Sequence, residues 1–434
     1  MKQINIALLG FGTVGTGVYK LLLENSIDIE HREGLSICVK RILVRDIQKA
    51  ARLQLADRSL FTLKIEDILD DPSISVVVEC MGGVEPSRTY ILSALSAKKS
   101  VVTANKEVIS KHWHTFEQQA RDSGAGLYIE ATVGGGIPLL RTLTDSLQAN
   151  NITRLMGIIN GTTNFILTRM SEKGMSFEEA LLEAQSRGYA EADPASDIEG
   201  FDATYKLSIL SSLAFHTHIP VDAVYREGIS SLSTSDFEAA RQLGYEIKLL
   251  AIGKKAPGAL VEVRVHPTML PKTHPLAAIR GSYNAVFITG NAVGDIMLYG
   301  KGAGQLPTAS SVVSDIIYAC HNEGRHRHNT FRNIPDMDKD THLVTDWESI
   351  YCIRTKVNDK PGVLSLISGV FAKHNVSLKS VLQFAQQDNS EGGQLAWITF
   401  VTHKAREKAV QSALREIDLL ECTLEVESLI RVEE

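Results

Sequence analysis

Short apolar runs alternate with amphipathic segments over the first 131 residues of the chain. An apolar run bounded by turn residues predicts a buried strand, and an apolar stripe that recurs every 3.6 residues predicts a helix. Strands are expected at residues 4–9, 37–44, 76–80, 101–104 and 127–131, and helices at 86–97 and 107–123. This alternation predicts an α/β domain with a parallel, doubly wound sheet, whose ligands bind at the carboxyl ends of the strands.

A glycine-rich turn directly follows the first strand and leads into a helix pattern. Its sequence is Gly10-Phe11-Gly12-Thr13-Val14-Gly15. The first glycine allows a tight turn, the second lets the backbone approach a pyrophosphate, and the third lets the helix pack on the strand. In this strand–turn–helix setting the motif predicts a Rossmann-like dinucleotide-binding domain over residues 1–130.

The end of the second strand indicates which dinucleotide is bound. A basic side chain there meets the 2′-phosphate of NADP, and an acidic one holds the ribose hydroxyl of NAD. The chain has Arg45 followed by Asp46 at this point. Arg45 favours NADP, and Asp46 keeps NAD open.

Lys106 follows the strand expected at residues 101–104, at the edge of the sheet where ligands bind. An ordinary solvated surface lysine is the alternative interpretation. Its place at this edge favours a functional role.

Residues 131–305 are expected to form a catalytic and dimerisation domain. A polar turn at 157–165 lies between two apolar segments. Strands expected at 248–253, 261–266, 285–289 and 295–299 predict a mixed sheet that can pair across a dimer axis. A helix at about 306–324 is expected to return to the dinucleotide domain.

An acidic stretch at residues 188–210 runs from a turn into a helix. Asp202 and Lys206 are four residues apart, so they share one face of that helix. A surface ion pair is the alternative interpretation. However, the helix is apolar nearly all round and therefore expected to be buried, and a buried lysine needs a partner or a function.

The polar residues 325–347 are interpreted as a linker to a module at 348–434. Strands and helices expected there follow the order βαββαβ, a ferredoxin-like unit. Because the catalytic candidates precede the linker, a chain ending near Asp346 is expected to fold and turn over. Four histidines in or next to the linker, His321, His326, His328 and His342, lack the spacing of a tetrahedral metal site.

Composition narrows the class of protein further. The net charge is −6, so the chain lacks the basic excess that nucleic acid binding requires. Five scattered cysteines without a CxxC motif indicate a reducing cytoplasm rather than a disulfide framework. We expect neither a signal peptide nor a membrane helix.

Several motifs, in order along the chain, resemble those of homoserine dehydrogenases. They are the glycine-rich turn, Ala104-Asn105-Lys106, the segment Gly157–Phe165, and the stretch containing Glu191, Asp202 and Lys206. The resemblance implies NAD(P)H-dependent, reversible reduction of L-aspartate 4-semialdehyde to L-homoserine, in threonine, methionine and isoleucine biosynthesis.

The resemblance also implies the roles of individual residues. Lys206 donates the proton, Lys106 assists, and the two lysines are expected to lower each other's pKa. Further substrate contacts are implied for Glu191, Asp202, Gly188, Asn160 and Thr162. Cofactor contacts are implied for Lys106, Gly188 and Gly304, besides the glycine-rich turn and Arg45. A monovalent cation, expected to be Na⁺, is implied at oxygens of Glu130, Val133, Gly135 and Ile137.

The C-terminal module resembles ACT domains through Asp359–Leu364 and Asn375. The resemblance implies an amino-acid effector, expected to be L-threonine, bound by Gly362 and Asn375. A purely dimerising module is the alternative, and a homodimer or homotetramer is expected.

Two other functions compete with this interpretation. Aspartate-semialdehyde dehydrogenase works through a cysteine thioester, and Cys80 is the nearest candidate nucleophile. A catalytically silent sensor of nucleotide and amino acid would not need Glu191, Asp202 and Lys206 together.

Overall fold

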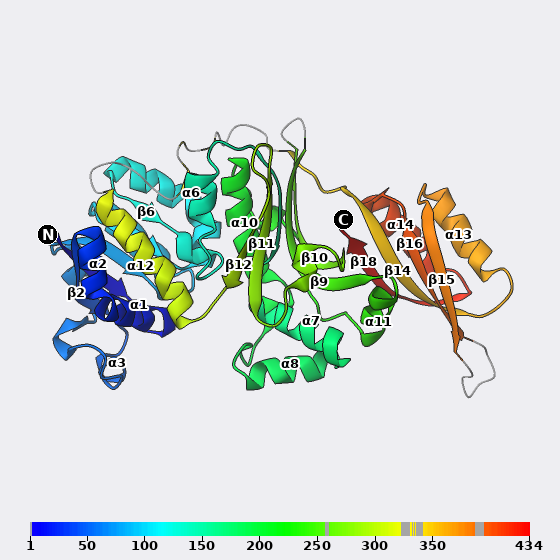
Figure 1. Ribbon diagram of the computed structural model, residues 1–434, viewed down its shortest axis with the longest axis horizontal. Helices are drawn as coiled ribbons and strands as arrows, with labels where there is room; N and C mark the ends of the chain where they lie inside the picture. Colours follow the sequence, from blue (N-terminus) through cyan, green and yellow to red (C-terminus); the bar gives the residue numbers. More distant parts are fainter. Residues whose placement is uncertain are drawn as a thin grey trace.

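The computed structural model describes residues 2–256, 260–322, 330, 331, 333, 335, 342–386 and 395–434. The dinucleotide end of the molecule is built on a six-stranded parallel sheet in the order β3-β2-β1-β4-β5-β6. This part lies at the end of the molecule marked by the N-terminus (Figure 1). The strands are β1 (Lys2–Leu9), β2 (Leu35–Leu43), β3 (Phe61–Thr62), β4 (Ile74–Glu79), β5 (Ser100–Thr103) and β6 (Leu127–Tyr128). The predicted doubly wound sheet is therefore confirmed, with strands within two residues of the expected positions except at 127–131.

Alternate residues of β1 face opposite layers of helices, as the pleat of a strand requires. Ile6 and Leu8 pack in one core with α1 and α12, whereas Ala7 and Leu9 pack in another with α5 and α6. The helices of this part are α1 (Thr13–Glu24), α2 (Ser26–Glu33), α3 (Ile47–Ala51), α4 (Glu66–Leu69), α5 (Ser87–Ser96), α6 (Lys106–Ser123) and α12 (Gln305–His321), with the 3₁₀ turns η1 (Arg58–Leu60) and η2 (Glu130–Thr132).

The return helix α12 lies against α1, as expected. A Cβ at Gly17 would stand only 2.8 Å from the Gln305 carbonyl, so glycine permits this close packing. The Gln305 amide also donates to Thr16 Oγ1 (3.0 Å).

The rest of the chain shares one mixed sheet, whose main path runs β12-β11-β7-β9-β10-β18-β14-β16-β15. The strands are β7 (Ile152–Ile158), β8 (Tyr225–Arg226), β9 (Tyr245–Ala256), β10 (Leu260–Pro271), β11 (Tyr283–Gly290), β12 (Gly294–Lys301), β13 (His342–Leu343), β14 (Glu348–Asn358), β15 (Leu378–Gln386), β16 (Leu395–Thr402), β17 (Ala405–Arg406) and β18 (Thr423–Val432). The helices and helical turns are η3 (Thr142–Ser146), α7 (Gly161–Lys173), α8 (Phe177–Ser186), α9 (Ala195–Ile198), α10 (Phe201–Phe215), η4 (Val221–Ala223), α11 (Thr234–Gln242), η5 (Pro275–Ala278), α13 (Val363–Lys373) and α14 (Glu407–Asp418).

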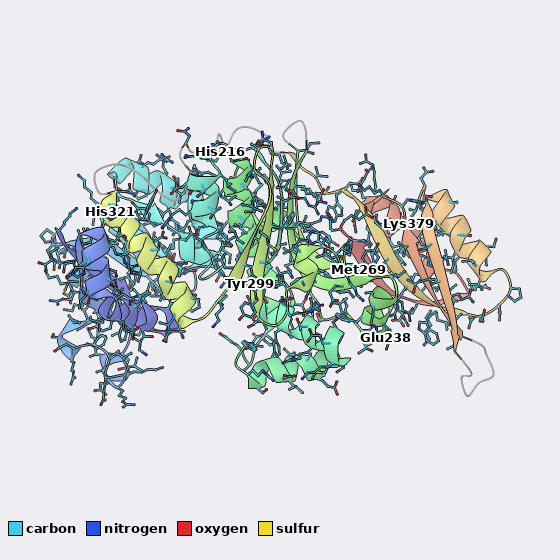
Figure 2. All side chains as sticks on the ribbon, viewed as in Figure 1. His216, Glu238, Met269, Tyr299, His321 and Lys379 are labelled. Carbon is cyan, nitrogen blue, oxygen red and sulfur yellow. The ribbon has the colours of Figure 1, made fainter. Side chains whose placement is uncertain are left out.

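The C-terminal βαββαβ unit is joined to the central domain through the sheet itself. Its last strand, β18, pairs in parallel with β10 at Thr268–Arg431 and Met269–Val432. The C-terminus consequently lies beside the central strands (Figure 1), close to the labelled Met269 (Figure 2). The linker interpretation also needs amendment at its end, since β13 pairs with β10 and Trp347 is buried.

The other expectations concern the strand at 127–131, the histidines near the linker, and membrane helices. The strand expected at 127–131 ends at Tyr128, because Glu130–Thr132 form a 3₁₀ turn. His326, His328 and the side chain of His342 lie outside the described residues. None of the described helices has the length and apolar character needed to cross a membrane.

Candidate active site

The glycine-rich turn has the geometry that phosphate binding requires. Gly10 has a φ of +99°, Gly12 is the N-cap of α1 with open space where a Cβ would be, and a Cβ at Gly15 would lie 2.2 Å from the Gly10 carbonyl. Backbone N–H groups at the start of α1 are left for an anion. Phe11 instead packs its ring on Tyr19 and Phe61, so only its backbone is placed to contact a cofactor.

Arg45 lines a cavity of about 410 Å³ at the end of β2, together with Arg58 from η1. The neighbouring Asp46 caps α3, and its Oδ1 accepts hydrogen bonds from Gln48 N (2.8 Å) and Lys49 N (3.0 Å). Two guanidinium groups beside a carboxylate already engaged as a helix cap favour an anionic ligand here.

Asp202 is the centre of the second part of the site. Its Oδ2 accepts from Lys206 Nζ (2.6 Å), and its Oδ1 lies 3.1 Å from Lys106 Nζ. Lys206 is 8% exposed and also donates to the Ile159 carbonyl (2.9 Å). The structure therefore brings the two predicted lysines to one carboxylate.

Asn160 connects this carboxylate to a second one. Its Nδ2 lies 2.9 Å from Asp202 Oδ2 and 2.6 Å from Asp197 Oδ1, while its Oδ1 caps α7 through Thr163 N (2.8 Å). Thr162 Oγ1 donates to the Tyr189 carbonyl (2.8 Å). The polar turn and the acidic stretch, far apart in sequence, are thus adjacent.

The charges in this cluster set its protonation. Burial raises the pKa of Asp202, but the ammonium groups of Lys206 and Lys106 outweigh it and hold that pKa well below the usual range. Burial, followed by the charge of Asp202, raises the pKa of Asp197. The Asp202 carboxylate raises the pKa of Lys106, so the expectation that the two lysines lower each other's pKa is wrong for Lys106.

Lys106 is placed by a chain of buried polar groups at the ends of β4 and β5. Glu79 Oε2 accepts from Thr103 Oγ1 (2.6 Å), which accepts from Asn105 N (3.0 Å). Asn105 then caps α6 through Val108 N (3.2 Å), so Lys106 is the first residue of the helix. Its side chain remains 38% exposed.

Phe331 lies between α6 and the end of α10. Its ring stacks on Trp113 (4.8 Å) and meets His216 edge-on (5.6 Å), and its carbonyl accepts from Arg121 (2.5 Å). Figure 2 labels His216 at this end of α10. The contact fixes the two helices whose first turns carry Lys106 and Asp202.

Other predicted residues lie outside the cluster. Glu191 is exposed, and among the described residues no contact joins its carboxylate to Asp202 or Lys206. Gly188, with a φ of +72°, ends the turn after α8, and Gly304, with a φ of +121°, precedes α12. Glycine at both positions is accounted for by backbone conformation.

The expected cation loop packs against the loop before α12. A Cβ at Gly135 would lie 2.5 Å from the Gly302 carbonyl, and the Gly135 carbonyl accepts from Ser311 Oγ (2.5 Å). Both carboxylate oxygens of Glu130 accept backbone hydrogen bonds, from Leu140 N (3.0 Å) and Arg141 N (2.7 Å). Burial and the neighbouring Asp315 raise the pKa of Glu130 to about 8.

The two effector candidates are separated in the C-terminal domain. Gly362 (φ +95°) precedes α13 and lines a cavity of about 410 Å³ with Lys360 and Gln383, whereas Asn375 follows the far end of α13. Eleven helical residues rise about 16 Å, so the expectation that both bind one amino acid within a chain is wrong. Asn375 has a φ of +56°, and asparagine tolerates this left-handed turn.

Sequence reasoning missed Glu79, Arg58 and the role of Asp197. Glu79 could have been found as an acidic residue ending an otherwise apolar strand, at the edge where ligands bind. Arg58 and Asp197 gave no such signal, since tertiary contacts alone bring them to their sites.

A dinucleotide fold whose strand ends face a lysine–carboxylate cluster defines a nicotinamide-dependent oxidoreductase. Comparison with known families identifies the particular family of oxidoreductases that the chain matches. Residues 10–130 match the NAD-binding domain of homoserine dehydrogenase, residues 138–317 match the homoserine dehydrogenase catalytic domain, and residues 353–418 match an ACT domain.

Full-length relatives agree. The homoserine dehydrogenase of Bacillus subtilis is 41% identical, covering 100% of this chain and 99% of its own. A crystal structure of a homoserine dehydrogenase from Thiobacillus denitrificans has a TM-score of 0.93 at 40% identity, covering 100% and 99% of the two chains. The structure of a hyperthermophilic archaeal homoserine dehydrogenase in complex with NADPH has a TM-score of 0.64 at 28% identity, covering 77% of this chain and 100% of that one. The chain belongs to the homoserine dehydrogenase family.

This membership decides against the two competing functions. Cys80 is also unsuited to nucleophilic attack, because burial raises its pKa far above the usual range of a thiol.

Proposed function

We propose that Lys206 is the proton donor in the reduction of L-aspartate 4-semialdehyde to L-homoserine at this site. The observation that carries the proposal is the buried Lys206–Asp202–Lys106 cluster at the strand ends of a dinucleotide fold. The bound reduced nicotinamide supplies the hydride. A hydride arriving at the carbonyl carbon leaves negative charge on oxygen, which a positioned ammonium stabilises and protonates.

Each member of the cluster has a distinct task in this proposal. Two hydrogen bonds hold Lys206 Nζ, to Asp202 Oδ2 and the Ile159 carbonyl, so its remaining N–H can point at the substrate oxygen. Lys106 is exposed enough to meet substrate directly. Asp202 raises the pKa of Lys106 and so keeps that amine protonated, and Glu191 and Asp197 are candidates to bind the substrate ammonium.

The test is homoserine-dependent reduction of NADP by the full-length chain, followed by absorbance. Reduction with homoserine but not with aspartate semialdehyde plus phosphate supports the proposal. Absence of homoserine oxidation under either nicotinamide cofactor would overturn it.

NADP, rather than NAD, is the proposed cofactor. The Arg45–Arg58 cavity offers two cations to a 2′-phosphate, and the structure of the archaeal relative is a complex with NADPH. Asp46, used as a helix cap, has one carboxylate oxygen left for a ribose hydroxyl.

We also propose a monovalent cation such as Na⁺ at the glycine loop, bound through main-chain oxygens. Since the Glu130 carboxylate is occupied by backbone N–H groups, the ligands would be the carbonyls of Glu130, Val133, Gly135 and Ile137. Such an ion would hold the loop between β6 and the catalytic domain in shape.

L-Threonine is the proposed effector of the ACT domain, bound at the Gly362 cavity rather than by Asn375. Asp359 and Lys360 in that cavity offer opposite charges to the two ends of an amino acid. Inhibition of full-length enzyme by threonine, relieved by Lys360→Ala, would support this site. Equal inhibition of both would place threonine in the active site.

A cytoplasmic homodimer or homotetramer is proposed for the assembly. β12 forms the end of the long sheet, and it exposes Met297 (40%) and Tyr299 (52%, labelled in Figure 2). Sedimentation equilibrium of the full chain measures the assembly directly.

A further inference from the structure

The contact between the central and C-terminal domains contains a fully buried arginine that binds both. Arg431, on β18, is 0% exposed. Its guanidinium forms ion pairs with Glu407 of α14 (2.6 Å) and with Glu227 of the central domain. The Arg431 side chain is fully buried, whereas the Glu227 side chain is 34% exposed. Glu227 is a central-domain residue through which this arginine contacts residues outside the C-terminal domain.

Glu227 belongs to residues 225–230, which pack on the segment just before the active-site helix. Glu227 N donates to the Val265 carbonyl of β10 (2.8 Å). Beyond it, Ile229 N donates to the Ile198 carbonyl (2.8 Å), and Ser230 Oγ donates to Glu199 Oε1 (2.7 Å).

The packing between these two segments leaves little freedom. A Cβ at Gly228 would lie 2.5 Å from the Ile198 carbonyl and 2.8 Å from Glu199 Cα. Arg226 places its guanidinium 3.6 Å from the centre of the Phe201 ring and donates to the Glu199 carbonyl. Residues 225–230 cannot shift without displacing residues 198–201.

Residues 198–201 connect the two carboxylates of the active site. Asp197 precedes them on α9, and Asp202 follows on the first turn of α10, which is preceded by Gly200 in a left-handed conformation (φ +81°). The position of Asp202 sets its bonds to Lys206 and Lys106. A continuous series of contacts therefore runs from Arg431 to the catalytic cluster.

We propose that Glu227 is a positioning residue for Asp202. Through its ion pair with Glu227, Arg431 makes the position of Asp202 depend on the position of the C-terminal domain. The inference rests on the proposed function for the reaction that Asp202 serves. Its alternative is an ordinary interdomain ion pair that only stabilises the fold.

The experiment compares full-length Glu227→Gln with a matched control, Glu433→Gln. Glu433 also joins the two domains, but it binds Lys254 (2.8 Å) and Arg264 instead of residues 225–230. Hydrogen–deuterium exchange of residues 195–206 should become about fivefold faster in Glu227→Gln and stay unchanged in Glu433→Gln. The kcat for homoserine oxidation should fall about tenfold in Glu227→Gln, with NADP affinity unchanged, and by less than about twofold in the control.

Each outcome decides the proposal. Similar thermal destabilisation of both variants, with exchange at 195–206 unchanged, would overturn it. If the wild type fails to oxidise homoserine, the proposed function fails, while exchange still decides whether Glu227 positions this segment. Should Glu227→Gln not fold, Ser230→Ala removes only the bond to Glu199 and must raise exchange in the same segment; no change there also overturns the proposal.

Discussion

The central domain meets its two neighbours through contacts of opposite character. Toward the dinucleotide domain, the ion pair between Lys106 and Asp202 leaves Lys106 38% exposed, and an aromatic contact at Phe331 lies farther along the same helices. Toward the C-terminal domain, Arg264 and Glu433 form an ion pair whose side chains are only 0% and 7% exposed, within one continuous sheet.

The two junctions differ in the burial of their ion pairs, because the first must admit a substrate and the second need not. A partly exposed ion pair contributes little stability and can exchange its partner for a substrate group. A buried pair is costly to break, and it fixes the relative position of the parts it joins. The first junction is therefore suited to chemistry, and the second to holding the ACT domain in a fixed position relative to the catalytic domain.

The largest expected effect is at the first junction. Lys206→Ala should lower kcat by about 10²–10⁴, as loss of a general acid typically does. NADP affinity should stay near that of the wild type, because the proton is needed only in the transition state. Steady-state kinetics and NADP titration check both parts. Near-normal turnover in the variant would mean that another group donates the proton.

The second junction is broken most directly by ending the chain near Asp346. From the sequence, this truncation was expected to leave folding and turnover intact. The structure changes that expectation, because Arg264, Lys254 and Glu227 would lose Glu433 and Arg431. The free energy of unfolding should fall by roughly 3–5 kcal/mol, the cost of breaking a buried pair. Denaturant titration of both chains measures it, and an unchanged midpoint would show that the junction is not stabilising.

The preference for NADP over NAD tests whether ligands bind on the dinucleotide-domain side of the molecule, at the first junction. Arg45→Ala should weaken NADP binding by about 10–100-fold, equivalent to about 1.5–3 kcal/mol for a hydrogen bond to a charged group. NAD binding should change much less, since NAD has no 2′-phosphate. Fluorescence titration with both cofactors is the measurement, and Arg58→Ala should repeat the pattern. Equal losses for NADP and NAD would assign Arg45 to the surface.

Acid should weaken the second junction before the first. Burial, then Arg264, Arg431 and Lys254, lower the pKa of His266 well below its usual value. A depressed folded-state pKa contributes stability that is present above the unfolded value and lost as pH falls. Stability should therefore drop below about pH 6.5, by at most about 1.4 kcal/mol per pH unit from this group. His266→Gln should flatten that slope in urea titrations from pH 7.5 to 5; an identical slope would assign it to other groups.

The sequence predicted those features of the structure that are encoded by residues close together along the chain. The parallel sheet and the glycine-rich turn are local patterns, and both were confirmed. The Asp202–Lys206 contact was also predictable, since four helical residues bring two side chains together. Lys106 required only the rule that ligands gather at strand ends.

The remaining features depend on contacts that no local pattern encodes. Pairing of β18 with β10 joins residues more than 160 positions apart, and the resulting burial of Arg264 and Arg431 is invisible in the sequence. The separation of Asn375 from Gly362 was also not evident, because it depends on the length and direction of α13.

The most direct test of the central claim follows the transferred hydrogen. Wild-type enzyme would be supplied with NADP and L-homoserine in which both C4 hydrogens are deuterium, and the reduced cofactor analysed by mass spectrometry. Oxidation at this site predicts NADPH that carries one deuterium, formed at a rate that Lys206→Ala lowers at least about a hundredfold. NADPH without deuterium, or labelled NADPH formed equally fast by Lys206→Ala, would contradict the account.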